Sequence, residues 1–163
     1  MLDYKNYLIF TKLKIFNLST FGHNGVDWMH SLLDSHPDIL IMPAFSFFRS
    51  LNLLKFRKKK FKNIHNIEIK EISNELTTQF YKEKMYQTQR RKFIFNLKQK
   101  KDFNFHLYSY LNYSKKHEDN LERRIFFGIH YAFSKIHKID IRKKKILVVQ
   151  EHVPWHSSKY LDI

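Results

Sequence analysis

Residues 13–42 read LKIFNLSTFGHNGVDWMHSLLDSHPDILIM, and this stretch decides the fold. Leu13 to Leu18 is β-prone and runs into a turn that contains Gly22 and Gly25. From Asp27 to Ser35 the apolar residues recur at the spacing of one helical stripe. They are Trp28, Met29, Leu32 and Leu33. The sequence therefore predicts a strand, a glycine turn and a helix in succession.

Two further strands are predicted by short apolar runs. His36-Pro37-Asp38 stops the first helix, because the residue before a proline disfavours helical dihedral angles. Ile39 to Met42 follows and is too short for a helix, and Ile146 to Val149 is a second continuous apolar run. Such runs are apolar on both faces, as buried parallel strands are. Strands separated by helical stretches predict an α/β fold with a parallel sheet and helical crossovers.

The middle of the chain is predicted to be helical. Phe45 to Phe56 is apolar with few helix breakers. Asp102 is a candidate N-cap for a helix that starts beside it. Three sets of residues have helical spacing: Ile69, Ile72, Leu76 and Phe80; Phe103, Leu107 and Leu111; and Leu121, Ile125, Ile129, Ala132 and Ile136. We expect these residues to face the core.

Length and composition bound the class of protein. The 163 residues suit a single domain over 1–163, and 43% apolar residues are ample for a core. The sequence has no apolar run long enough to span a membrane and no amino-terminal secretory pattern, so we expect a soluble, cytoplasmic protein. It has no cysteine, which excludes disulfides, thiolate catalysis and cysteine-based zinc sites.

The formal charge of +15 has several interpretations. The sequence has 23 lysines and 7 arginines, a skew that is typical of an AT-rich genome. Its basic residues form runs that suit a solvated surface, at Lys55 to Lys62, Lys98 to Lys101 and Arg142 to Lys145. They could also steer an anionic ligand, or contact nucleic-acid phosphate. A basic module that binds nucleic acid or another polyanion without catalysis is therefore the alternative function. The sequence contains no base-reading motif and does not favour nucleic acid as the partner.

A candidate site follows from the parallel sheet, because ligands bind outside the carboxyl ends of such strands. The segments that follow the three predicted strands should gather at one edge. A glycine turn that opens a helix presents backbone N–H groups and the positive end of the helix dipole to an anion. Many such turns only connect two elements, so both interpretations remain open.

The stretch FGHNGVDWMHSLLDSHPDI resembles the 5′-phosphosulfate loop of sulfotransferases. In that family a strand is followed by Lys or Arg, Ser, Gly, two hydroxyl residues and an aromatic or leucine. On this pattern the candidate donor-binding residues are Gly22, His23, Asn24, Gly25, Val26, Asp27 and Trp28. His23 stands at the position of the basic residue, whose role in the family is to stabilise charge on the leaving phosphate.

The later stretch VVQEHVPWHSSKYLDI resembles the family strand that ends in Thr-His-Leu-Pro. His152 falls on the histidine that serves as general base for the acceptor hydroxyl in many members. The resemblance implies a P-loop-like architecture and sulfuryl transfer from 3′-phosphoadenosine 5′-phosphosulfate to a hydroxyl acceptor, without a metal. The candidate catalytic residues are His152 and His23.

The sequence also departs from the family. Val26 and Asp27 replace the two hydroxyl residues, and Asp27 could instead cap its own helix. The family's later strand, loop and helix, which also hold the donor, have no counterpart in these residues. We therefore expect an amino-terminal portion of the fold whose transfer activity is impaired, or a degenerate relative that keeps the shape of the loop without its chemistry.

Overall fold

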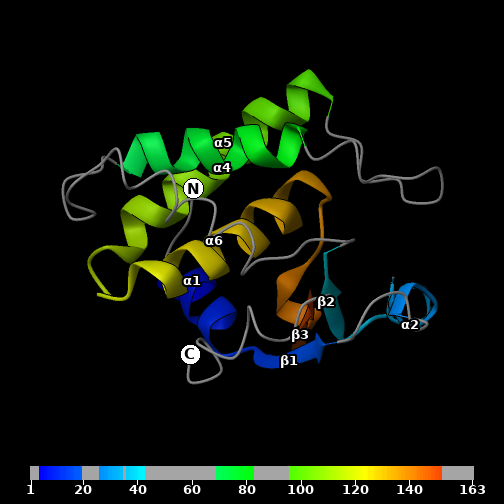
Figure 1. The fold of residues 1–163 in the computed structure, drawn as a ribbon. Helices are drawn as coiled ribbons and strands as arrows, with labels where there is room; N and C mark the ends of the chain where they lie inside the picture. Colours follow the sequence, from blue (N-terminus) through cyan, green and yellow to red (C-terminus); the bar gives the residue numbers. More distant parts are fainter. Residues whose placement is uncertain (1–3, 20–25, 35, 43–68, 83–95, 152–163) are drawn as a thin grey trace.

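The computed structural model describes residues 4–19, 26–34, 36–42, 69–82 and 96–151. A parallel sheet forms one side of this part of the protein, and a stack of helices lies against it (Figure 1). The predicted helix over Phe45 to Phe56 lies outside the described residues.

Three strands form the sheet: β1 (Lys14–Ser19), β2 (Ile39–Ile41) and β3 (Ile146–Glu151). All three predicted strands are confirmed. Both neighbouring pairs are parallel, and the order β1-β3-β2 puts the last strand in the chain at the centre. Leu147, Val148 and Val149 are all buried, as expected for a central strand that is apolar on both faces. The structure is thus an α/β fold with an open parallel sheet.

The helices are α1 (Tyr4–Thr11), α2 (Val26–Leu33), α4 (Ile69–Lys82), α5 (Leu97–Ser114) and α6 (Leu121–Ile136), and a 3-10 turn η3 (Ile141–Lys143) precedes β3. The helices predicted around residues 27–35, 69–80 and 121–136 are confirmed. The Asp102 cap is wrong, because α5 begins five residues earlier. Asn96 is its N-cap, and its side chain accepts from Gln99 N at 2.8 Å while Gln99 Oε1 accepts from Asn96 N at 3.1 Å.

Helix α6 is the centre of the core. Every residue from Arg124 to Ser134 is buried, as in a helix that is covered on all sides. Its side chains share one cluster with Phe10 of α1, Leu76 of α4, Leu107 of α5 and Leu147 of β3. The core therefore joins the sheet to the helices across α6.

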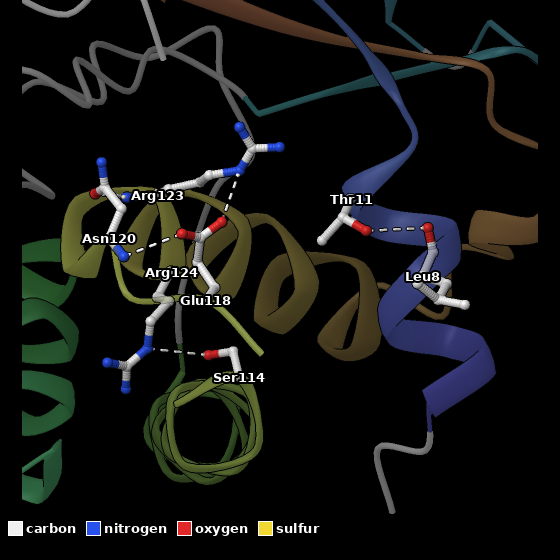
Figure 2. Close-up of polar contacts among 7 residues, drawn as sticks. All are labelled: Leu8, Thr11, Ser114, Glu118, Asn120, Arg123 and Arg124. Carbon is white, nitrogen blue, oxygen red and sulfur yellow. Dashed lines mark hydrogen bonds and ion pairs between the residues drawn. The ribbon is translucent and has the colours of Figure 1, made fainter. Parts of the chain in front are cut away.

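The corner between α5 and α6 is fixed by a polar network (Figure 2). The buried Arg124 donates from Nη2 to Leu111 O at 2.7 Å and from Nε to Ser114 Oγ at 3.3 Å. Glu118 accepts from Asn120 N at 3.0 Å. Arg123 Nε lies 3.1 Å from Glu118 Oε2, an ion pair without hydrogen-bond alignment. Glu118 thus satisfies the backbone N–H of the N-cap of α6, and Arg124 adds a charged donor to Leu111 O, which also accepts from Lys115 N.

Candidate functional site

The candidate site lies at the carboxyl edge of the sheet, where β1 and β3 end together. Ser19, the last residue of β1, is the register partner of Glu151, the last residue of β3. Neighbouring strands are separated by about 4.8 Å, so the chain leaves the sheet at two adjacent points on the same level. The shorter β2 ends with Ile41 opposite Val148. The sequence expectation that these strand ends share one edge is confirmed.

The candidate donor loop is described only where it enters α2. Gly22, His23, Asn24 and Gly25 lie outside the described residues. The predicted order of strand, turn and helix is nevertheless confirmed, because β1 ends at Ser19 and α2 begins at Val26. Val26 and Asp27 are thus the first two residues of the helix. Their backbone N–H groups belong to the first turn, whose N–H groups have no partner within the helix.

Trp28 is the aromatic residue of the candidate loop. Its side chain is 66% exposed, and Leu32 and Met29 on the same stripe are 55% and 40% exposed. The predicted helical stripe therefore exists but does not join the core. The indole is therefore accessible to solvent.

His152, the candidate general base, is the residue after the end of β3 and lies outside the described residues. The same holds for His23, so the role of each stays a prediction. The structure brings together the two strand ends that precede His23 and His152 in the sequence.

Asn17 is a polar residue of this region that the sequence reasoning missed. It lies in β1 opposite Val149, two residues before the strand ends, and its buried Oδ1 has no hydrogen-bond partner among the described residues. A buried acceptor without a donor destabilises the fold by about 1–3 kcal/mol. The signal was present in the sequence, since Asn17 is the one side chain with a polar group in the run from Ile15 to Leu18.

The described histidines outside this edge do not gather into a second site. His130 is fully buried in α6 and its Nδ1 lies 2.8 Å from Phe126 O; burial lowers its pKa to about 4. His137 follows the end of α6, and partial burial lowers its pKa as well. Within the described ranges, no group of three or more potential metal-ligating side chains is found.

Comparison with protein-family models, with curated proteins and with solved structures finds no match for this chain. In the part of the chain that the structure describes, no helix has the length and apolarity that crossing a membrane requires.

Proposed function

We propose that the carboxyl edge binds 3′-phosphoadenosine 5′-phosphosulfate and that the protein takes part in sulfuryl transfer to an acceptor hydroxyl. The observation that carries this proposal is the register of β1 and β3, in which Ser19 and Glu151 are partners. It puts the last residue of β1 and the last residue of β3 side by side in the sheet. The donor loop and His152 therefore start from adjacent points, as a reaction between two substrates held at one edge requires.

In the proposed arrangement the phosphosulfate lies against the turn before α2. Backbone N–H groups of residues 24–28 and the positive end of the α2 dipole attract the anion. His152 removes the proton from the acceptor hydroxyl, whose oxygen then attacks sulfur as the bond to the phosphate oxygen breaks. His23, as an imidazolium, stabilises the charge that develops on that phosphate. Trp28 offers its exposed ring to the adenine.

Donor binding can be tested with adenosine 3′,5′-bisphosphate, using ligand-observed saturation-transfer NMR because that method detects millimolar affinities. We expect transfer of saturation to the adenine protons in the presence of the protein. Gly25→Trp should abolish it, because a side chain at this position would fill the turn where the phosphate lies. His152→Ala should keep it, because the proposed base contacts the acceptor and not the donor.

The opposite pattern would contradict the proposal. If the ligand shows no saturation transfer, or if Gly25→Trp leaves it unchanged while circular dichroism shows a folded protein, the turn is a connection without a donor site. If His152→Ala alone abolishes binding, His152 belongs to the donor site and its role as base is wrong.

A further inference from the structure

β1 is an edge strand of the described sheet (Figure 1). The order β1-β3-β2 gives it one described neighbour, β3, which it follows along its full length. Lys14 N donates to Lys145 O at the start of this pairing. Successive residues of a strand direct their N–H and C=O groups to opposite sides, so every second residue from Lys14 faces β3 and the others face the side without a described strand. These outward residues are Ile15, Asn17 and Ser19.

The side chains of β1 leave this edge open on both faces of the sheet. Ile15 is 42% exposed and Phe16 is 56% exposed, and adjacent residues of a strand point to opposite faces. At the other edge of the sheet, Leu40 and Ile41 of β2 are buried. β1 has no proline, and its one charged residue is Lys14 at its start. Residues 15–19 therefore lack the features by which edge strands commonly avoid pairing.

Asn17 indicates which strand fits this edge. It is half-buried, and its Oδ1 is buried without a hydrogen-bond partner among the described residues. A side-chain amide carries both a donor and an acceptor, so a second Asn17 is a complementary partner for it. Asn17 also presents its backbone groups outward. In an antiparallel pair of two β1 strands it can lie opposite itself as a hydrogen-bonded pair, with the two Cα atoms about 5.5 Å apart.

A pairing centred on Asn17 uses every outward backbone group of β1. Ile15 then lies opposite Ser19 of the second copy, and each hydrogen-bonded pair exchanges two N–H···O=C bonds. On the other face of the sheet, Phe16 lies opposite Leu18 of the second copy, an aromatic–aliphatic contact across the strands. The two Lys14 residues lie about 20 Å apart, more than twice the Debye length at physiological salt, so the strand pair brings no like charges together.

We propose that β1 pairs antiparallel with β1 of a second copy of this chain, about a twofold axis at Asn17. The two sheets then join into one continuous sheet, in which the antiparallel pair lies between two parallel halves. The pairing does not depend on sulfuryl transfer, because it uses the side of β1 and leaves the carboxyl ends of the strands free. Two six-residue strands form a small interface, so we expect a weak dimer.

Association is tested by sedimentation velocity from about 5 to 500 µM protein, at about 0.3 M salt so that the repulsion between two chains of charge +15 is screened. The weight-average mass should rise with concentration from that of one chain toward that of two. Hydrogen exchange over the same range follows the edge directly. The amides of Ile15, Asn17 and Ser19 should gain protection as the dimer forms, whereas the amide of Phe16, which faces β3, should be protected throughout.

The register is tested by single cysteines, which are unique because the natural chain contains none. Asn17→Cys should form a disulfide-linked dimer under a mild oxidant, because the paired Cα atoms lie within the range that a disulfide spans. Ile15→Cys is the matched control on the same face of the strand. Its two copies lie about 14 Å apart along the paired strands, so it should cross-link much more slowly although Ile15 is the more exposed residue.

The surface is tested by Phe16→Glu, a change at an exposed position that the monomer should tolerate. It removes both contacts between Phe16 and Leu18 and sets two carboxylates about 7–8 Å apart across the axis, so it should weaken association about tenfold or more. Phe105→Glu changes the net charge equally at an aromatic residue of α5 that is 64% exposed. This control should dimerise as the parent does.

The proposal is wrong if any of four results is obtained. A monomer whose outward amides exchange freely at about 500 µM would leave the edge to a strand of a different protein. A monomer whose outward amides are protected at the lowest concentration would show that another segment of this chain covers the edge. Equal cross-linking of Asn17→Cys and Ile15→Cys would exclude the twofold register. Equal weakening by Phe16→Glu and Phe105→Glu would assign association to another surface.

Discussion

Acid should destabilise this protein through one residue in the middle of its core. His130 is 1% exposed, and desolvation lowers its pKa to about 4 from an ordinary value of 6.5. The folded state therefore holds the neutral ring, whereas the unfolded chain binds a proton as the pH falls through 6.5. The contribution of His130 is fully present above pH 6.5 and is lost progressively between 6.5 and about 4.

The size of the effect follows from the difference of about 2.5 pH units between the two states. One unit corresponds to about 1.4 kcal/mol, so the complete loss is about 3 kcal/mol, and most of it has occurred at pH 4.5. This is a large share of the 5–15 kcal/mol by which domains are commonly stable.

The assay is urea unfolding at pH 7.5 and pH 4.5 for the parent and for His130→Leu. The parent should lose about 2–3 kcal/mol more between the two pH values than the variant, since the leucine side chain binds no proton. His137→Gln, at the end of the same helix, is the control. In this variant the loss of unfolding free energy that His130 causes between pH 7.5 and pH 4.5 should remain. Parallel losses in the parent and in His130→Leu would refute the reasoning.

Two other substitutions test contacts described above. Arg124→Met should destabilise the protein by about 2–3 kcal/mol, because Leu111 O loses a charged donor at a buried corner and Ser114 Oγ loses the Arg124 contact drawn in Figure 2. The urea midpoint measures this loss, and an unchanged midpoint would show that water replaces the guanidinium. Asn17→Val should stabilise the protein by about 1 kcal/mol, because it removes the unpartnered Oδ1 from β1; a lower thermal midpoint would show that Asn17 has a partner in solution.

The sequence predicted those elements of the fold that a short pattern of neighbouring residues indicates. The runs that start at Leu13, Ile39 and Ile146 predicted the strands, because a short apolar segment bounded by helix-breaking or charged residues is typical of a strand. The start of α5 was wrong, because the reciprocal bonds of Asn96 and Gln99 formed a better cap than Asp102. α1 was missed, because its four consecutive apolar residues from Tyr7 to Phe10 hide the helical period.

The features that depend on long-range pairing could not be predicted. Nothing near Ile146 indicates that β3 lies between β1 and β2, since this order depends on partners more than 100 residues away. The common edge of the strand ends was predicted from the general behaviour of parallel sheets, and it is confirmed. The roles of His23 and His152 come only from a resemblance and stay predictions.

The central position of β3 also determines when the sheet can form. Among the described strands, β1 and β2 pair only with β3, so neither has a described partner until residues 146–151 have been synthesised. At a translation rate of about 5–20 residues per second, Lys14 waits roughly 7–26 seconds for its register partner Ile146. During that interval the α5–α6 hairpin can form from local contacts, while the strands keep their hydrogen-bonding edges open. Chaperones that hold nascent chains should therefore raise the yield of folded protein without raising its stability.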